Sequence, residues 1–185
     1  MKNLYVKEFM VPLSEYATVS EEATLRDAVR ALKKAQKAFD SDRYRHRAVL
    51  VFDKNNRIVG KLSQHDIIQA IEPNYRNMKG MDGLSRFGLS PALVESLLEQ
   101  YSLWDRPVEQ LCLVAANLKV KEIMYTPAEG EYVSQDASLG AAIHQLVTGK
   151  HHSLLVTDGE KIVGILRLTD VFSLISEKLE QMCDE

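Results

Sequence analysis

The sequence contains few cysteines and no long run of apolar residues. Its two cysteines, Cys112 and Cys183, are too few and too far apart to indicate a disulfide framework or a zinc site. No apolar stretch approaches the roughly 20 residues that a membrane-spanning helix needs. The N-terminal stretch "MKNLYVKEFMVP" mixes charged residues with apolar ones, so it lacks the apolar core of a signal peptide. We therefore expect a cytoplasmic protein without membrane association.

The chain also has little net charge. Its formal charge of -3 at pH 7 gives no general attraction to nucleic acid or to an anionic membrane. Apolar residues make up 45% and charged residues 26%, which is the balance of a globular protein. A length of 185 residues suffices for one ordinary domain or for two small domains that share a core. These figures set the class of protein and leave its function open.

The short motifs of common catalytic and metal centres are missing as well. The sequence has no Gly-x-Ser-x-Gly string, no Gly-x-x-x-x-Gly-Lys loop and no Gly-x-Gly-x-x-Gly string, so we name no catalytic residue and expect no enzyme. His151 and His152 are adjacent and would point to opposite faces of a strand. With His144 they lack a carboxylate or cysteine that would complete a ligand set, so we expect no metal site.

What the sequence does contain is an internal repeat, the feature that most constrains a fold. The string "VKEFM" at residues 6–10 returns as "VKEIM" at 120–124, a shift of 114 residues. At the same shift, "VSEEATL" at 19–25 returns as "VSQDASL". "GKLSQHDII" at 60–68 matches "GILRLTDVF" at 164–172, a shift of only 104 residues. The first copy therefore carries about ten extra residues, one in a turn and the others near "AFDSDRYRHR", where an insertion suits a loop.

Each copy predicts the same order of elements: an extended segment, a helix, two strands and a second helix. The first helix starts at Thr24 or at Ser138, which are both good N-caps, and its apolar residues recur at helical spacing. A hairpin follows, with its turn at residues 53–56 in the first copy and at Asp158-Gly159 in the second. A unit of about 60 residues buries too little apolar surface to be stable alone. Two copies packed together are therefore expected.

A segment of different character, residues 73–119, separates the copies. Pro73 ends the preceding helix, and "NMKGMDGLSRFG" is typical of irregular structure. Ser90-Pro91 predicts a helix start, and a second short helix is expected near Pro107. The expected apolar residues of the two helices are Leu93, Val94, Leu97, Leu98 and Tyr101, and then Val108, Leu111, Cys112 and Ala115. A helical hairpin that caps the core or forms a dimer interface is favoured over a separate ligand site.

These repeated strings resemble a tandem pair of CBS domains, often called a Bateman module. The resemblance rests on "VKEFMVP" and "VKEIMYTP", on the two "VS…A[TS]L" helix starts, and on "VLVFDKNNRIVGKLSQHDI" and "LLVTDGEKIVGILRLTDVF". It implies an α/β fold of two CBS repeats, residues 1–72 and 120–185, with the helical insertion 73–119 between them. Each repeat would be a small mixed sheet with flanking helices, and the two would pack as a pseudo-symmetric pair. Because CBS pairs commonly assemble into flat discs, the resemblance also implies a homodimer.

The same resemblance implies a regulatory binding module. Members of this family hold adenosine compounds in clefts between the repeats, so the expected ligand is an adenine nucleotide (AMP, ADP or ATP) or S-adenosylmethionine, with no covalent cofactor. Binding would signal through the dimer or through a partner, such as an effector enzyme or a transporter. The alternative is a structural or protein-interaction module with degenerate, ligand-free clefts. No nucleic-acid or membrane partner is expected.

The family's Gly-x-x-[Ser/Thr]-x-x-Asp pattern assigns roles to individual residues. Its Asp binds the ribose hydroxyls and its Ser or Thr approaches phosphate. These positions are Asp66 and Ser63 in the first copy, and Asp170 and Arg167 in the second, where Arg167 departs from the pattern. By their place in the motifs, further residues flank the clefts: Thr18, Arg47 and Val49 for the first, and Val133 and His152 for the second.

The chemistry of these residues leaves alternatives open. A carboxylate accepts two hydrogen bonds at once, which suits a vicinal diol, and a hydroxyl at a helix N-terminus suits phosphate. However, Ser-x-x-Asp before an apolar run is also a capping box. Since arginine is no N-cap, we expect the second cap to move to Thr169, which leaves Asp170 in the first helical turn. Arg167 either donates to a phosphate or pairs with Asp170, so the two clefts are expected to be unequal.

Basic residues also precede one strand, in "DSDRYRHR" at 40–47. They either hold a polyphosphate tail or form a solvated loop balanced by the neighbouring aspartates, and the solvated loop is favoured. Nucleic-acid binding is not expected there, because the patch is short and few aromatic residues interleave with it.

Overall fold

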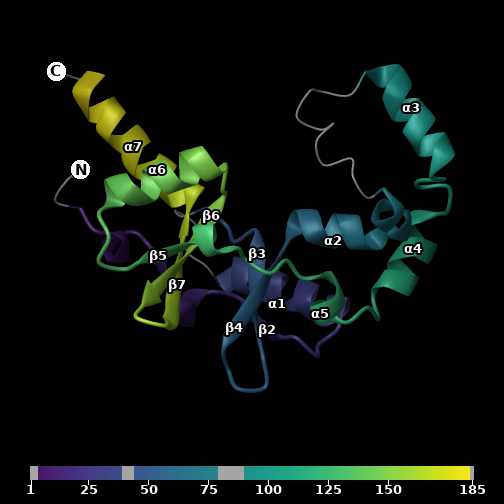
Figure 1. Ribbon diagram of the computed structural model, residues 1–185, viewed down its shortest axis with the longest axis horizontal. Helices are drawn as coiled ribbons and strands as arrows, with labels where there is room; N and C mark the ends of the chain where they lie inside the picture. The colour runs from purple at the N-terminus through teal and green to yellow at the C-terminus, as the bar shows by residue number, and fades with distance from the viewer. Residues whose placement is uncertain (1–3, 39–43, 79–89, 184–185) are drawn as a thin grey trace.

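The computed structural model describes residues 4–38, 44–78 and 90–183, and these form two small mixed sheets with helices around them (Figure 1). The first sheet, of order β2-β3-β4, consists of β2 (Thr18–Ser20), β3 (Ala48–Phe52) and β4 (Ile58–Ser63). The second, of order β1-β7-β6-β5, consists of β1 (Val11–Pro12), β5 (Tyr132–Ser134), β6 (Ser153–Asp158) and β7 (Lys161–Arg167). In each repeat a short strand, β2 or β5, pairs parallel with the first strand of a hairpin, and the two strands of the hairpin are antiparallel. The predicted α/β architecture of two repeats is confirmed.

Two longer helices accompany each sheet. They are α1 (Leu25–Ala38) and α2 (Gln64–Ile71) in the first repeat, and α6 (Leu139–Gly149) and α7 (Leu168–Cys183) in the second. The insertion contributes α3 (Pro91–Gln100) and α4 (Val108–Ala115). Single turns of helix lie between these elements: η1 (Val6–Glu8), η2 (Leu13–Glu15), η3 (Pro73–Asn77), α5 (Val120–Ile123) and η5 (Glu129–Glu131). No helix in the described part of the chain is long and apolar enough to cross a membrane.

Local sequence signals act where they were predicted. Ser138 caps α6 by accepting a hydrogen bond from the Ala141 N–H at 3.3 Å. Thr24 accepts from the Asp27 N–H at 3.3 Å at the start of α1. The hairpin turns contain Asn56 and Gly159, whose φ values of 58° and 57° lie in the left-handed region that turn residues tolerate. The predicted caps at Thr24 and Ser138 and the two predicted hairpins are therefore confirmed.

The opening segments of the two repeats are exchanged. The Val6 and Lys7 N–H groups donate to carbonyls just before α6, at 3.1 and 3.0 Å. In mirror fashion, the Val120 and Lys121 N–H groups donate to carbonyls just before α1, at 2.9 and 3.0 Å. Val6 is buried in the core of the second repeat and Val120 in the core of the first. Each "VKE" string thus completes the core of the other repeat.

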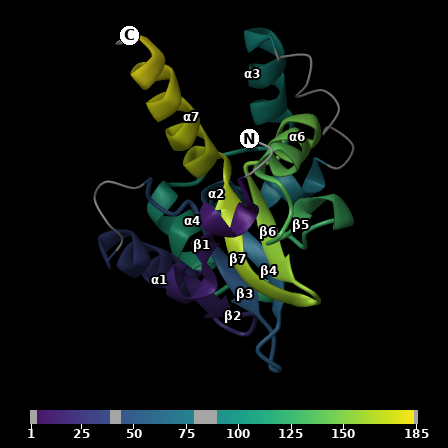
Figure 2. The ribbon, with the colours of Figure 1, turned by 90° about the vertical axis from the view of Figure 1, so that its left-hand side faces the viewer.

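The exchange extends into both sheets. β1 from the first repeat pairs antiparallel with β7 of the second, where Val11 lies opposite Ile165 (Figure 2). On the other side, the backbones of Tyr125 and Lys61 exchange two hydrogen bonds of 2.9 Å, so the opening segment of the second repeat adds to β4 of the first. A third core cluster between the sheets includes Val11, Tyr16, Leu50, Leu155 and Ile165.

Two glycines make this close approach sterically feasible. A Cβ atom at Gly164 would lie 2.5 Å from the Val11 carbonyl oxygen. A Cβ atom at Gly60 would lie 2.7 Å from the Met124 sulfur and 3.0 Å from the Tyr125 carbonyl oxygen. The glycine of each repeated "G-x-x-[S/R]" string therefore accommodates the exchanged segment of the chain itself.

The insertion is anchored where α2 ends. The Glu72 carboxylate, which is 1% exposed, accepts hydrogen bonds from the Asn74 and Trp104 N–H groups at 3.0 and 2.9 Å. The Trp104 indole N–H donates to the Tyr75 hydroxyl at 3.1 Å. The predicted cap at Ser90 and the predicted helix near Pro107 are confirmed. The stretch expected to be irregular is residues 77–88, and its residues 79–88 lie outside the described residues.

The predicted apolar face of α4 is only partly correct. Leu111 and Ala115 are buried, and α4 packs against α2. Val108, however, is 55% exposed and Cys112 is also exposed. Because α4 buries only one narrow side against the core, the stripe of buried residues is narrower than the sequence pattern indicates. In α3, Leu97 is buried while Leu93, Val94 and Leu98 are more than a third exposed.

We predict that Gly164→Ala lowers the free energy of unfolding by about 1–3 kcal/mol, because the added methyl group clashes with the Val11 carbonyl. The control is Gly140→Ala in α6, where an added Cβ atom meets nothing within 4 Å. That change should stabilise the protein by about 0.5–1 kcal/mol through helix propensity. Urea denaturation of both variants measures the difference. Equal stabilities would show that the exchanged segment is not tightly packed.

Candidate functional site

The pattern residues of the first repeat lie where β4 runs directly into α2. Ser63 is the N-cap of α2, and its hydroxyl accepts from the Asp66 N–H at 3.2 Å. The Ser63 N–H and hydroxyl both donate to Asp66 Oδ2, at 2.8 and 2.7 Å. The other oxygen, Oδ1, lies 4.0 Å from the imidazole of His65 and accepts no hydrogen bond from another described residue. The capping box is therefore complete and still leaves one oxygen of this half-buried carboxylate available.

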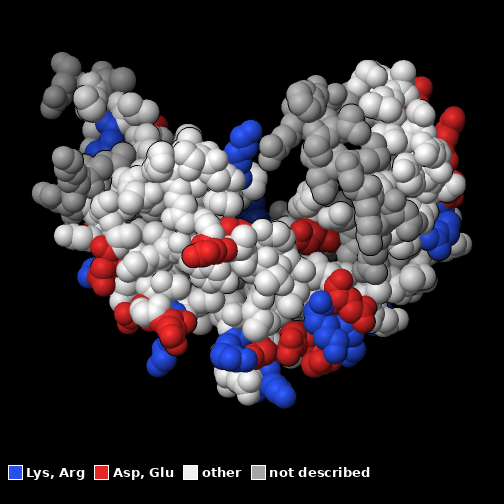
Figure 3. All heavy atoms as spheres, in the orientation of Figure 1, with Lys and Arg blue, Asp and Glu red and all other residues white. Residues whose placement is uncertain are grey.

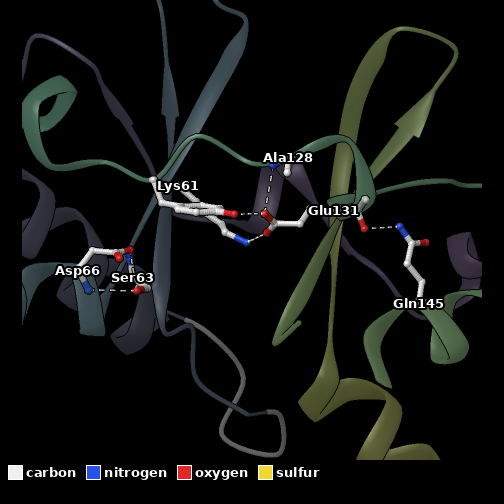
Figure 4. Close-up of polar contacts among 8 residues, drawn as sticks. Lys61, Ser63, Asp66, Ala128, Glu131 and Gln145 are labelled. Atoms are coloured by element: carbon white, nitrogen blue, oxygen red, sulfur yellow. Dashed lines mark hydrogen bonds and ion pairs between the residues drawn. The ribbon is translucent and has the colours of Figure 1, made fainter. Parts of the chain in front are cut away.

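A buried charged cluster lies beside this helix start (Figure 4). Lys61 precedes Ser63 by two residues on β4, so both side chains point to the same face of the sheet. The Lys61 ammonium group pairs with Glu131, which also accepts from the Tyr125 hydroxyl and from the Ala128 N–H at 3.2 Å. The Lys61 and Glu131 side chains are only 16% and 3% exposed. The Lys61 ammonium group is thus held toward Glu131 and points away from the Ser63–Asp66 pair (Figure 4).

The pKa values in this cluster follow from its hydrogen bonds. Burial by itself would raise the pKa of Glu131, but the hydrogen bonds from Lys61, Tyr125 and the Ala128 N–H hold it below its ordinary value. The hydrogen bond to Glu131 raises the pKa of Tyr125, and burial raises it further. Lys61 and Glu131 therefore face each other as ions, and Tyr125 remains protonated and donates to the carboxylate. Sequence reasoning missed this cluster, although the lysine in the otherwise apolar strand "IVGKLS" was a signal of it.

In the second repeat, Arg167 occupies the position of Ser63 and makes different contacts. Its Nε donates to Asp170 Oδ2 at 2.6 Å, and its Nη2 donates to Asp170 Oδ1. Its Nη1 donates to the Tyr44 carbonyl oxygen at 2.7 Å and lies 3.4 Å from His46 Nδ1. Arg167 is 5% exposed, so this guanidinium joins both repeats from a buried position.

The predicted cap of the second helix is wrong. α7 begins at Leu168, so Thr169 lies inside the first turn and does not precede it. The first N–H group of α7 is instead bonded to the residue before β6, because the Leu168 N–H donates to the His152 carbonyl at 2.9 Å. In the first repeat the Gln64 N–H donates to the Arg47 carbonyl in the same way. The backbone geometry is thus conserved between the repeats without a capping hydroxyl. Asp170 lies in the first helical turn as predicted.

The stretch before β3 is not simply a solvated loop. Tyr44, Arg45 and Arg47 are exposed, but His46 is fully buried. The centroid of its ring lies 4.4 Å from that of Tyr16 in an edge-to-face contact. Burial raises the pKa of Tyr16 to about 12, although the nearby Arg167 opposes that shift. His46 was expected in the solvated loop and instead lies in the interface between the repeats. Arg43, in the same stretch, lies outside the described residues.

A pocket of about 230 Å³ opens beside Asp170. Its carboxylates come from Glu8, Asp170 and Glu177, and the described residues that line it include no lysine or arginine. In the described part of the chain no group of histidine, cysteine, aspartate and glutamate side chains is arranged to hold a metal ion. On the face drawn in Figure 3, acidic and basic side chains lie side by side along the lower edge, so no broad field of one sign covers that edge.

The remaining sequence-predicted residues occupy the edges and the cores of the sheets. Arg47 and His152 are exposed at the entries to β3 and β6, beside the starts of α2 and α7. Thr18 is exposed at the start of β2. Val49 and Val133 belong to the hydrophobic clusters of their repeats, so their side chains contribute to packing.

Comparison with known families supports the repeat. The family model of the CBS domain matches residues 6–73 and 120–177. A comparison with curated proteins found no match.

Solved structures show the same fold. The chain is similar to the CBS domain of a CBS-domain-containing membrane protein from Sphaerobacter thermophilus, with 20% identity, coverage of 94% of this chain and 88% of that chain, and a TM-score of 0.61. It is similar to CBSX2 in complex with AMP, with 19% identity, coverage of 95% and 98%, and a TM-score of 0.57. It is also similar to the cytosolic domain of the Mg²⁺ channel MgtE in complex with ATP, with 20% identity, coverage of 90% and 46%, and a TM-score of 0.54. Identities this low establish the fold alone.

We predict that Glu131→Gln lowers the free energy of unfolding by about 3–5 kcal/mol at pH 7, because it leaves the buried Lys61 ammonium group unpaired. The double variant Lys61→Met/Glu131→Leu should recover most of this loss, since it removes both buried charges. Urea denaturation measures each value. A loss below about 1 kcal/mol would show that the pair is effectively solvated.

The same pair predicts a pH dependence. A carboxylate whose pKa is lowered by folding stabilises the protein above its unfolded-state pKa, and that stabilisation is lost as the pH falls through the folded-state pKa. The stability difference between the wild type and Glu131→Gln should therefore be complete above about pH 4.5, the ordinary pKa of Glu131, and shrink below it. A difference that grows on acidification would contradict the lowered pKa.

Proposed function

Because the chain belongs to the CBS-domain family, we propose that it is a regulatory module that binds an adenine nucleotide beside Ser63 and Asp66. Two similar structures are complexes with AMP and with ATP, which supports an adenine ligand. The observation that carries the proposal is the Asp66 carboxylate, which uses Oδ2 in the helix cap and keeps Oδ1 for another donor.

The local chemistry suits a ribose followed by phosphate. Asp66 Oδ1 accepts a hydrogen bond from a ribose hydroxyl, and a charge-assisted bond of this kind is among the stronger ones. The N-terminal turn of α2 offers the positive end of its dipole to a phosphate group. Lys61 lies on the same face of β4 as Ser63, and its ammonium group pairs with Glu131. This cation limits the repulsion between the ligand's negative charge and the neighbouring carboxylates. S-adenosylmethionine shares the ribose but lacks the phosphate, so it tests which of these features matters.

We predict that Asp66→Ala weakens nucleotide binding by about 10-fold to 100-fold, which corresponds to one hydrogen bond to a charged group. Calorimetric titration with AMP, ADP, ATP and S-adenosylmethionine measures the affinity. The matched control is Asp27→Ala, because Asp27 forms the same capping box with Thr24 at the start of α1. Both variants should lose stability to a similar small extent, because each removes the acidic partner of a capping box.

The comparison of these two variants separates binding from capping. If both bind the ligand as the wild type does, Asp66 is only a cap and does not contact ribose. If none of the four compounds binds the wild type, the favoured function becomes that of a structural or protein-interaction module. The complete capping box at Ser63 is the observation that keeps this second function in view.

We further propose that the protein is a homodimer assembled through α2 and α7. Ile68 and Phe172 occupy equivalent positions in the two repeated strings and are 56% and 58% exposed. Large apolar side chains exposed at equivalent positions on these helices suit a symmetric interface. Binding beside the start of α2 would then reach the interface through that helix, and an effector enzyme or transporter would read the change.

We predict that Ile68→Asp and Phe172→Asp each convert the dimer to a monomer in sedimentation experiments, because a charge in the interface is costly to desolvate. The control is Val114→Asp on α4, where the side chain is 64% exposed. This control should remain dimeric. Dissociation by Val114→Asp alone would place the interface on the helical insertion instead.

A further inference from the structure

The second repeat has an aspartate at the ribose position, but both oxygens of its carboxylate are hydrogen-bonded within the protein. Asp170 accepts one hydrogen bond from Arg167 on each of its two oxygens. In the first repeat, by contrast, the cap uses only Oδ2 of Asp66. A ribose diol at the second position therefore competes with a guanidinium group for both oxygens, whereas at the first position Oδ1 is not contested.

This guanidinium group is difficult to displace. It is buried, and its Nη1 also donates to the Tyr44 carbonyl of the first repeat. A bidentate arginine–carboxylate pair is one of the stronger polar contacts in proteins. Separating it would leave two buried charges without their partners, which is strongly unfavourable. Arg167 therefore acts as an internal substitute for a ligand and bridges the repeats.

Electrostatics adds to this effect. The positive charge of Arg167 is balanced by Asp170, and the adjacent pocket also presents Glu8 and Glu177. The described lining of this pocket contributes no lysine or arginine that would offset them. A phosphate group entering this pocket meets the carboxylates of Glu8 and Glu177 in addition to the Arg167–Asp170 pair, while beside α2 it meets the Asp66 carboxylate and the Lys61–Glu131 pair. The two clefts differ in charge as well as in occupancy of the carboxylate.

We infer that Arg167 closes the second cleft to ribose, so that the protein binds one nucleotide per chain, beside Asp66. The stoichiometry rests on the proposed function of the first cleft. The closure of the second cleft rests only on the contacts of Arg167.

The test is a calorimetric titration of AMP and ATP into the wild type and Arg167→Ser, which restores the family pattern. The wild type should bind one ligand per chain and Arg167→Ser two. The added site should disappear in Arg167→Ser/Asp170→Ala and persist in Arg167→Ser/Asp66→Ala. If the wild type binds two ligands per chain, or if folded Arg167→Ser gains no site, the inference is wrong.

A second variant covers the case in which Arg167→Ser does not fold, which circular dichroism and thermal melting will show. Asp170→Asn keeps an oxygen that accepts from Arg167 and removes the charge that ribose would need. The inference expects the wild-type affinity and stoichiometry for this variant, and a loss of binding would overturn it. If the wild type binds no nucleotide while Arg167→Ser binds one through Asp170, the proposed function of the first cleft fails and the closure by Arg167 stands.

Discussion

The structure depends on the reciprocal exchange of two short segments. The backbone of residues 6–7 is hydrogen-bonded to the second repeat, and that of residues 120–121 to the first, through equivalent atoms. The buried side chains at these points, Val6 and Val120, fill cores that neither repeat completes alone. Lys7–Asp136 and Lys121–Glu22 repeat the symmetry on the surface, but exposed ion pairs contribute little. Backbone hydrogen bonds and apolar burial therefore hold the pair together, and the core of each repeat includes residues of the other.

The two junctions that this exchange creates are not equivalent. Each repeat contributes a short extended segment to the sheet of the other repeat, and the residues at the two junctions differ. At one junction Val11 lies against Ile165 within an apolar cluster. At the other, Tyr125 lies against Lys61, whose ammonium group is held by Glu131. The pseudo-symmetric backbone thus supports an apolar contact on one side and a buried ion pair on the other.

Local features were predictable from the sequence and contacts between the repeats were not. The caps at Thr24 and Ser138 and the turn at Gly159 depend on residues within a few positions, so the pattern predicts them. The burial of His46 and the ion pair of Lys61 depend on residues of the other repeat. A prediction that treats each strand separately does not show which residues of the two repeats come into contact. The shift of the cap to Thr169 was a wrong prediction, because it assumed that a helix start needs a capping side chain. Here the hairpin carbonyl at His152 serves the Leu168 N–H instead.

Capping of α2 by Asp66 does not exclude a further contact of the same carboxylate with a ligand. A carboxylate has two oxygens, and the cap of α2 engages only Oδ2. The cap fixes the side-chain rotamer, which spares a ligand the entropy of ordering it. At Asp170, by contrast, the arginine that replaces the serine donates a hydrogen bond to each of the two oxygens. One substitution in a repeated string, Ser63 against Arg167, thus converts an available acceptor into a contact that holds the two repeats together.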